Sequence, residues 1–191
     1  FLEELKKQYP ECFIIPEGGT NEHALTGVGE VISELDNQTS FDTLMVPVGS
    51  GGTLSGLIKA DQNRHKLLGI AVLKESEYLL KDIHQLIQPN ENQYNNWALM
   101  GEFHRGGYAK FSTTDLQRLK EFIDITGIPF EPVYSGKMVL ALLDLAEQGY
   151  FANNHKVMLI HTGGMQGLGG LAERNLIKAS EWHLPSGPPA R

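Results

Sequence analysis

Residues 46–58 read Val46-Pro47-Val48-Gly49-Ser50-Gly51-Gly52-Thr53-Leu54-Ser55-Gly56-Leu57-Ile58. The apolar residues before Gly49 lack polar alternation, which is typical of a strand buried on both faces of a parallel sheet. The residues after Thr53 favour a helix. A glycine-rich loop between such a strand and such a helix lies where open α/β sheets bind ligands. This stretch therefore predicts an α/β fold with a binding loop at residues 49–53.

The composition of this loop favours the binding of an anion. Gly49, Gly51 and Gly52 have no side chains, so the backbone can adopt unusual angles and direct successive amides at one anion. The start of the following helix adds a favourable dipole, and Ser50 and Thr53 add hydroxyl donors. We therefore expect a phosphate group here. A tight turn with Thr53 as the helix N-cap is the simpler alternative for the same residues.

The spacing of the loop argues against two other phosphate-binding motifs. A nucleotide P-loop requires Gly-Lys before its Ser or Thr, whereas Thr53 follows Gly52. A dinucleotide fingerprint requires Gly-x-Gly-x-x-Gly, and Leu54 stands where its third glycine would be. The loop fits a single phosphate on a small cofactor better.

Strands and helices alternate on both sides of the loop. The apolar periodicity predicts helices over 1–8, 21–35, 54–60, 77–88, 113–126 and 136–148, and strands over 12–15, 43–48, 67–73 and 156–161. This alternation predicts a doubly wound, mostly parallel sheet with helices on both faces. We expect one domain over residues 1–180, followed by a Pro- and Gly-rich tail over 181–191 that we expect to be disordered.

The composition is that of a globular protein and excludes several classes of function. Of the 191 residues, 41% are apolar and 20% are charged, which suits one domain of ordinary size. The net charge of -7, without a run of Lys or Arg, argues against nucleic acid as a partner. No apolar stretch is long enough for a membrane span. Cys12 is the only cysteine, so we expect no disulfide within the chain, no multi-cysteine metal site and a cytoplasmic location.

Four further segments stand in a fixed order around the loop: Ile15-Pro16-Glu17-Gly18-Gly19-Thr20-Asn21, Gly106-Gly107-Tyr108, Glu131-Pro132-Val133-Tyr134-Ser135-Gly136-Lys137 and Ile160-His161-Thr162-Gly163-Gly164. With residues 49–53 they resemble the 1-aminocyclopropane-1-carboxylate deaminase and D-cysteine desulfhydrase branch of the fold type II, tryptophan-synthase-like pyridoxal-phosphate enzymes. The resemblance runs from about Pro10 to Glu173. It implies the cofactor pyridoxal 5'-phosphate, and it likens the chain to the C-terminal part of such an enzyme, in its large cofactor-binding domain.

The resemblance also implies roles for individual residues. It places the cofactor phosphate on residues 49–53, and it places Tyr134 and Tyr108 on the substrate side of the ring, with Tyr134 as the acid/base. A phenol normally titrates near pH 10, so a neighbouring positive charge or the cofactor itself would have to stabilise its phenolate. Ser135 and Thr162 are candidate hydroxyl partners of the pyridine nitrogen.

Ser135 bears on the choice of reaction. The deaminases of this family carry glutamate at this position, whereas desulfhydrase-like members resemble this sequence in having a hydroxyl residue. A hydroxyl cannot supply the negative charge that keeps the pyridine nitrogen protonated, so the ring becomes a weaker electron sink, which suits α,β-elimination. We therefore expect a D-cysteine desulfhydrase-like lyase that releases pyruvate, ammonia and sulfide from a small amino acid. The alternative is a deaminase that opens 1-aminocyclopropane-1-carboxylate to 2-oxobutanoate and ammonia.

Four other polar residues of these segments receive weaker roles. The resemblance makes His161 a scaffold residue. Lys137 follows the tyrosine and opens a helix, so it is not taken as the lysine that binds the cofactor covalently. Glu17 and Asn21 either shape the site or cap the following helix.

In this family the lysine that binds the cofactor lies upstream of the segment matching residues 16–21, and the printed sequence does not include that region. We therefore expect the 191 residues alone to be inactive and to be part of a longer enzyme. Missing neighbours would leave an exposed sheet edge or apolar patch, from which we expect a homodimer. The alternative from another class is a non-catalytic, phosphate-binding scaffold.

Overall fold

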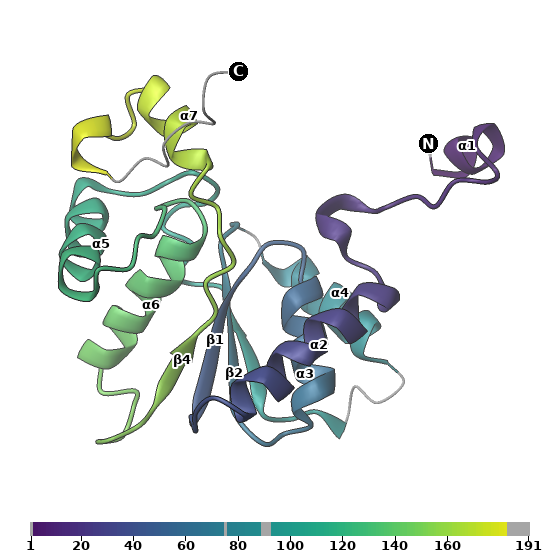
Figure 1. Ribbon diagram of the computed structural model, residues 1–191, viewed down its shortest axis with the longest axis horizontal. Coiled ribbons are helices and arrows are strands. Elements are labelled where there is room, and N and C mark those ends of the chain that lie inside the picture. The colour runs from purple at the N-terminus through teal and green to yellow at the C-terminus, as the bar shows by residue number, and fades with distance from the viewer. Residues whose placement is uncertain (1, 75, 89–92, 183–191) are drawn as a thin grey trace.

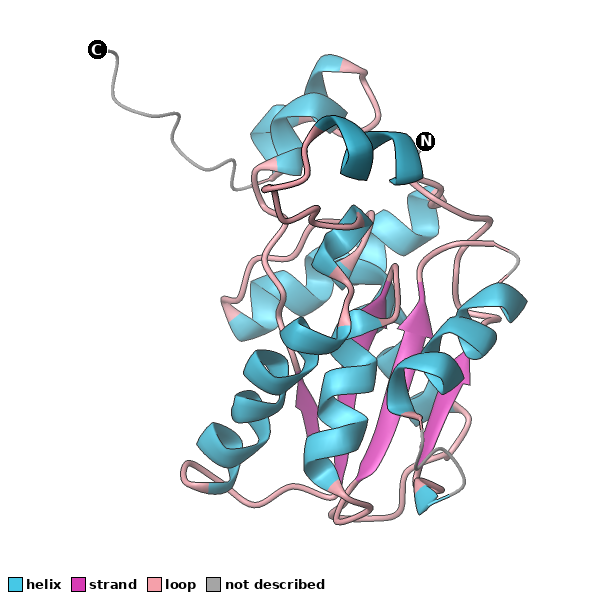
Figure 2. Ribbon diagram, turned by 90° about the vertical axis from the view of Figure 1, so that its right-hand side faces the viewer, coloured by secondary structure: helices cyan, strands magenta, loops and turns pink. Residues whose placement is uncertain are grey.

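The computed structural model describes residues 2–74, 76–88 and 93–182 (Figure 1). Within them, four parallel strands form one sheet in the order β3-β2-β1-β4. The strands are β1 Thr43–Val48, β2 Lys66–Ala71, β3 Trp97–Met100 and β4 Val157–Leu159. All of them run in the same direction, so their carboxyl ends meet at one edge of the sheet (Figure 2).

Helices cover both faces of this sheet (Figure 1). One face carries α2 Glu22–Asp36, α3 Gly52–Asp61 and α4 Glu77–Ile87, and the other carries α5 Thr113–Thr126 and α6 Ser135–Glu147. From β1 the chain passes through α3 to β2 and then through α4 to β3. It returns through α5 and α6 to β4, which lies on the other side of β1. The predicted doubly wound sheet with helices on both faces is confirmed.

Strand β1 shows why its sequence has no polar alternation. Leu44, Val46 and Val48 pack against α2, α3 and α4, whereas Met45 points to the opposite side and packs against α5 and α6. Because successive side chains of a strand point to opposite faces, and both faces are covered, every residue of β1 is buried. The central strand therefore holds the two layers of the core together.

The bounds of several elements match the sequence-based expectation, and a few do not. Strand 43–48 and helix 113–126 are found as predicted. The strand predicted over 12–15 is wrong, since these residues lie outside the sheet and Ile15 is 73% exposed. An apolar run this short becomes a strand only beside a neighbour with which it can pair. The short strand β3 and the glycine-rich helix α7, Gly167–Glu173, were not predicted.

The folded part of the chain extends past the expected boundary at residue 180. Ala179–Glu181 forms a short 3-10 helix. Trp182 is half-buried and packs against the core beside α5 and α6 and against the apolar cluster of α7. Of the tail predicted to be disordered, Glu181 and Trp182 are thus ordered, and residues 183–191 lie outside the described residues.

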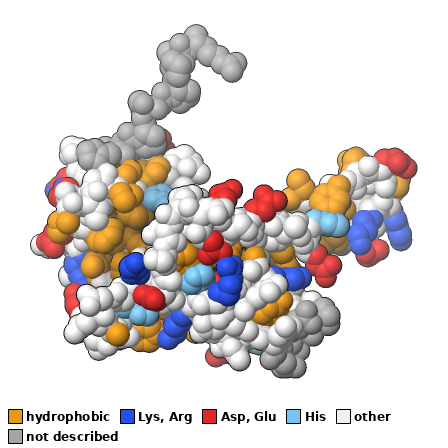
Figure 3. Space-filling model, turned by 60° about the horizontal axis from the view of Figure 1, so that its bottom comes forward, with side chains coloured by type: hydrophobic (Ala, Val, Ile, Leu, Met, Phe, Trp, Pro, Cys, Tyr) orange, Lys and Arg blue, Asp and Glu red, His pale blue; other side chains and the backbone are white. Residues whose placement is uncertain are grey.

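The amino-terminal end of the chain projects from the body (Figure 1). Helix α1, Leu2–Gln8, buries none of its residues. The segment that follows exposes apolar side chains, including Tyr9 and Phe13, and Figure 3 shows apolar atoms along this arm. An exposed apolar surface, as the sequence predicted, is therefore present on residues 2–15.

Candidate functional site

The glycine loop lies at the carboxyl edge of the sheet, between β1 and α3 (Figure 2). Gly51 has a positive φ of 86° and is the N-cap of α3, so the helix begins at Gly52, two residues earlier than predicted. The first backbone N–H groups of a helix have no partner within it. Those of Gly52, Thr53 and Leu54 are therefore available to an anion at this end of the helix.

Contacts with the Gly18–Asn21 segment require small residues in the loop. A Cβ atom on Gly52 would lie 2.6 Å from Thr20 Oγ1, and one on Gly18 would lie 2.6 Å from Ser50 Oγ. The hydroxyls of Thr20 and Ser50 are themselves hydrogen-bonded at 2.6 Å. Sequence reasoning gave no role to Thr20, although it belongs to a motif that carried the resemblance. Thr20 therefore joins Ser50 and Thr53 as a third hydroxyl at the loop.

The loop suits a phosphate group on electrostatic grounds. The small hollow beside it is lined by residues 47–54 and Tyr134. No carboxylate lines this hollow among the described residues, so nothing there repels an anion. The free amides of the α3 amino terminus and the glycines that keep the backbone bare supply the donors. The residues present thus fit the phosphate of pyridoxal 5'-phosphate.

Asn21 and Glu17, left open by the sequence, lie in the segment that contacts the loop. Asn21 is the N-cap of α2, and its side-chain oxygen accepts a hydrogen bond from the Ala24 amide at 3.1 Å. Glu17 is exposed in a 3-10 turn, Glu17–Gly19. The capping alternative is therefore correct for Asn21.

Tyr134 stands against the glycine loop just before α6. Its hydroxyl donates to the Pro47 carbonyl at 3.2 Å, and a Cβ on Gly49 would lie 3.2 Å from its ring. Burial raises the pKa of the Tyr134 phenol, a backbone hydrogen bond from Gly49 lowers it, and the charge of Glu131 raises it, with a net rise. The phenol therefore keeps its proton at neutral pH. The positive charge expected to stabilise a phenolate is not among the causes of this shift.

Both predicted catalytic tyrosines line one cavity of about 310 Å³. Its walls are formed by Tyr108, Ala109, Glu131, Val133, Tyr134, Gly164, Gly167, Gly170, Leu171 and Arg174. Tyr108 is 67% exposed, whereas Tyr134 is half-buried. The volume is at the lower end of the range of roughly 300–1,000 Å³ seen for small-molecule sites. The structure thus brings together two residues that lie far apart in the sequence.

The two predicted partners of the pyridine nitrogen do not line this cavity. Ser135 is fully buried, and its hydroxyl donates to Glu131 Oε1 at 3.0 Å. Thr162 is exposed in the loop after β4, whereas Gly164 of the same loop forms part of the wall. The proton of Ser135 is therefore already engaged.

Glu131 is a member of the site to which sequence reasoning gave no role. Its carboxylate accepts hydrogen bonds from the amides of Val133 at 2.6 Å, Tyr134 at 2.9 Å and Ser135 at 2.5 Å. Burial raises the pKa of Glu131, and these hydrogen bonds oppose the rise. The carboxylate thus caps α6 and fixes the backbone that carries Tyr134. In the sequence, a carboxylate a few residues before the start of a helix is the signal that could have indicated this cap.

Lys137 and His161 have structural partners, as expected. The Lys137 side chain is fully buried, and its Nζ donates to the carbonyls of Val72 at 3.0 Å and Gly107 at 2.5 Å. Burial lowers the pKa of Lys137 to about 8. His161 Nε2 contacts the Pro129 carbonyl at 2.8 Å, and its ring stacks on Phe130. Neither side chain faces the cavity of the tyrosines.

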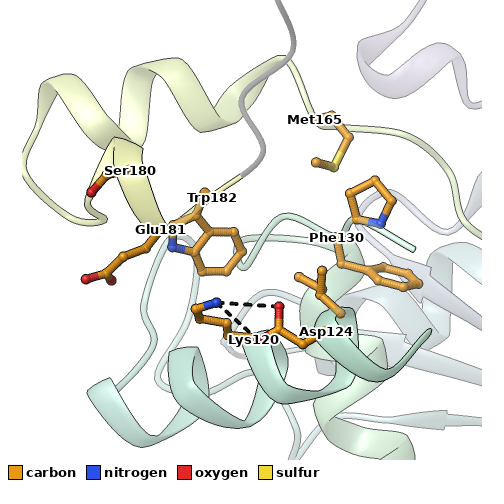
Figure 4. Close-up of a pocket in the computed structure, with 9 residues that line it drawn as sticks. Lys120, Asp124, Phe130, Met165, Ser180, Glu181 and Trp182 are labelled. Atoms are coloured by element: carbon orange, nitrogen blue, oxygen red, sulfur yellow. Dashed lines mark hydrogen bonds and ion pairs between the residues drawn. The ribbon is translucent and has the colours of Figure 1, made fainter. Parts of the chain in front are cut away.

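A second cavity, of about 350 Å³, lies between α5 and residues 180–182. Figure 4 shows the Lys120–Asp124 ion pair, 3.2 Å long, below the rings of Trp182 and Phe130. None of its described lining residues belongs to the site of the tyrosines. In the described part of the chain, no cluster of three or more His, Cys, Asp or Glu residues could hold a metal ion. No described helix is both long and apolar enough to cross a membrane.

Comparisons with known proteins show the family of the chain. The family model for pyridoxal-phosphate dependent enzymes matches residues 1–163. A Thermotoga maritima protein provisionally named 1-aminocyclopropane-1-carboxylate deaminase is 32% identical over 176 residues, which are 85% of this chain and 55% of that protein. A bifunctional mitochondrial D-cysteine desulfhydrase/1-aminocyclopropane-1-carboxylate deaminase of Arabidopsis thaliana is 27% identical, over 87% of this chain and 45% of that protein.

Two further matches give the same picture. A D-cysteine desulfhydrase of Klebsiella pneumoniae is 26% identical over 82% of this chain and 51% of that protein. A crystal structure of an ACC deaminase homologue superposes with a TM-score of 0.76 at 28% identity, and the match covers 91% of this chain and 56% of that one. The chain thus spans about half the length of the relatives it matches.

Proposed function

The chain belongs to the family of pyridoxal-phosphate dependent enzymes, and from this we propose that it forms the cofactor-binding part of a D-cysteine desulfhydrase-like lyase. The reaction would release pyruvate, ammonia and sulfide from a small amino acid. The observation that carries the proposal is the contact between Tyr134 and the start of the glycine loop. This contact supports the proposal, because it holds the proposed acid/base residue beside the expected anchor of the cofactor phosphate.

In this proposal the glycine loop holds the cofactor by its phosphate. The amides at the start of α3 and the hydroxyls of Ser50 and Thr53 are the donors, and Gly49, Gly51 and Gly52 let the backbone approach closely. When bound, pyridoxal phosphate supplies an electron sink for breaking bonds at the amino acid's α-carbon. We propose that Lys137 is not the lysine that binds it covalently, because the Lys137 side chain is fully buried and donates to two backbone carbonyls.

The pyridine nitrogen is proposed to meet a hydroxyl group. The Ser135 proton is directed at Glu131, so in this arrangement Ser135 can only accept a further hydrogen bond. The exposed Thr162 hydroxyl is therefore the better donor to an unprotonated ring nitrogen. A hydroxyl partner leaves the ring a weaker electron sink, which favours elimination with a leaving group that accepts the electrons.

The tyrosines would handle protons and position the substrate. Tyr134 holds its proton at neutral pH, so it is suited to act first as an acid toward the substrate or its leaving group. Tyr108 is exposed at the mouth of the same cavity and would contact the substrate from the other side. The cavity that they line has a volume of about 310 Å³, so the substrate is expected to be small.

Ring opening of 1-aminocyclopropane-1-carboxylate is the second candidate. It is favoured by the names of relatives such as the Thermotoga maritima protein, at 32% identity. Elimination is favoured by the hydroxyl residue at position 135, where the deaminases of the family carry glutamate. A cytoplasmic homodimer is also proposed. The single cysteine supports the cytoplasmic location, and the apolar residues exposed on 2–15 support the homodimer.

Turnover by the full-length protein tests the proposal. The protein with pyridoxal phosphate is incubated with D-cysteine or with 1-aminocyclopropane-1-carboxylate, and its absorbance spectrum is followed. Pyruvate with sulfide from D-cysteine is the expected result, and 2-oxobutanoate would assign the deaminase reaction instead. A protein that binds the cofactor without either product would be a phosphate-binding scaffold, and the enzyme proposal would be rejected.

A further inference from the structure

Lys137 is a buried charge that the proposed reaction does not use. Its side chain has no exposed surface, although lysine is almost never fully buried without partners. Its Nζ donates hydrogen bonds to two backbone carbonyls, those of Val72 and Gly107. Neither is a charged group, so this ammonium is held mainly by two charge-assisted hydrogen bonds.

The two carbonyls connect separate parts of the site. Val72 directly follows β2 at the carboxyl edge of the sheet, and Gly107 directly precedes Tyr108. Lys137 itself is the third residue of α6 and lies three positions after Tyr134. One side chain thus connects the helix behind Tyr134 to the loop that carries Tyr108.

The loop that carries Tyr108 is anchored at Arg105, which pairs with Asp144 and Asp115, and Lys137 holds it a second time at Gly107, next to Tyr108. Arg105, Gly106, Gly107 and Ala109 all have positive φ angles, between 52° and 116°, so this stretch has no regular structure of its own. Its backbone amides make three local hydrogen bonds: Gly107 donates to the His104 carbonyl, Lys110 to the Gly107 carbonyl, and Gly106 to His104 Nδ1. Tyr108 is largely exposed and has little packing to hold it in place.

The charged groups that act on Lys137 come from three other elements. Glu131 precedes α6, Asp115 lies in the first turn of α5, and Arg105 belongs to the loop of Tyr108. Glu131 and Asp115 favour the ammonium, whereas Arg105 and above all burial disfavour it. Burial by itself favours the uncharged amine. The hydrogen bonds to the two carbonyls therefore help to keep the Lys137 side chain charged.

We propose that Lys137 is a positioning residue that sets the distance between Tyr108 and Tyr134 across the substrate cavity by donating hydrogen bonds to the Gly107 and Val72 carbonyls. The effect on turnover rests on the proposed function. The effect on the loop does not, because it concerns the backbone alone.

A purely structural role for Lys137 predicts a different outcome. Met has nearly the same length and no donor, and replacing a buried charge with an apolar residue of similar volume is often neutral or stabilising. Lys137→Met would then leave both the loop and the catalytic constants unchanged. The positioning role predicts a looser loop and poorer catalysis in a protein that is no less stable.

The test compares Lys137→Met with wild type in the full-length protein, with Lys120→Met as the matched control on the partly exposed surface of α5. Amide hydrogen exchange is measured over residues 103–110 without substrate. We expect at least tenfold faster exchange there, a fall of about tenfold in kcat/KM for D-cysteine and unchanged affinity for pyridoxal phosphate. Lys120→Met should match wild type in all three.

Lys137→Gln provides a second variant, since its amide keeps two N–H donors on a side chain one atom shorter. We expect it to fall between wild type and Lys137→Met in both exchange and kcat/KM. Wild-type exchange over residues 103–110 in a folded Lys137→Met protein would overturn the proposal, as would Lys137→Gln exchanging faster than Lys137→Met. Should the wild-type protein turn over neither substrate, only the proposed function fails, because the exchange measurement needs no activity.

Discussion

The hydroxyl of Tyr134 donates a hydrogen bond to the backbone carbonyl of Pro47 at 3.2 Å. Pro47 belongs to the central strand β1 and stands two residues before Gly49, where the glycine loop begins. The phenol is thereby held by the same strand that supports the proposed phosphate site. The hydrogen bond therefore links the position of the phenol to the strand from which the glycine loop extends.

Tyr134→Phe should reduce turnover without loss of the cofactor. Removing a positioned proton donor costs about 10²- to 10⁴-fold in rate, so we expect kcat to fall by roughly that factor. Affinity for pyridoxal phosphate should change by less than about threefold, because the loop's amides are untouched. Tyr150→Phe is the control, since Tyr150 is partly exposed and lies outside the described lining of the cavity. Equal kcat values for the two variants would contradict the role of Tyr134.

Gly52→Ala should weaken binding of the cofactor. The new Cβ would lie 2.6 Å from Thr20 Oγ1, so either Thr20 or the start of α3 must shift, and the amides move with it. We expect a rise of at least about tenfold in the dissociation constant, equivalent to about 1.4 kcal/mol, measured by titration with pyridoxal phosphate.

Gly27→Ala is the matched control for that substitution. Gly27 lies within α2, and a Cβ there would meet no atom within 4 Å. Alanine in a helix is better than glycine by about 0.5–1 kcal/mol, so this variant should be more stable and bind the cofactor as wild type does. If Gly27→Ala also bound the cofactor more weakly, the weaker binding by Gly52→Ala could not be assigned to the contact with Thr20.

Glu131→Gln should destabilise the protein. The carboxylate accepts from three successive amides and from the Ser135 hydroxyl, and an amide group has only one oxygen to replace its two. Leaving buried donors unpaired costs about 1–3 kcal/mol, which chemical denaturation should detect as a lower free energy of unfolding. Glu30→Gln, at an exposed position of α2, should change it by less than about 0.5 kcal/mol. A stable Glu131→Gln protein would refute the capping role.

The stability of the protein should depend on pH through Lys137. Its pKa is lowered from 10.5 to about 8, so between these values the unfolded chain binds a proton that the folded chain does not. The free energy of unfolding of wild type relative to Lys137→Met should therefore rise with pH in this window, by at most about 1.4 kcal/mol per pH unit. Denaturation at about pH 7 and pH 9.5 measures this difference. Parallel behaviour of the two proteins would mean that Lys137 titrates normally.

The Thr20 and Ser50 hydroxyls should be energetically coupled. They lie 2.6 Å apart and join the turn before α2 to the glycine loop. A double-mutant cycle with Thr20→Val and Ser50→Ala should give a coupling energy of about 0.5–1.5 kcal/mol in the free energy of unfolding. Strictly additive effects would show that the contact makes no contribution in solution.

Local patterns in the sequence were sufficient for the fold, whereas the roles of the site residues were inferred from the resemblance to a family and stay predictions. The apolar run of β1, the glycines after it and the period of α5 each depend on neighbours a few residues away, and their positions were predicted correctly. The run at 12–15 shows the limit of such patterns. It has the composition of a strand, but pairing requires a second strand, and the described residues offer none beside it.

The sequence by itself therefore determined a doubly wound α/β domain, and its resemblance to a family predicted a phosphate-binding loop and two catalytic tyrosines, which line one cavity. Only the tertiary structure decided that the Ser135 proton goes to Glu131, that Thr20 reaches Ser50, and that Lys137 supports the loop of Tyr108. The physical reason is distance along the chain. Periodicity reports what neighbouring residues do together, whereas the partner of a buried polar group is selected by whichever segments packing brings within hydrogen-bonding reach.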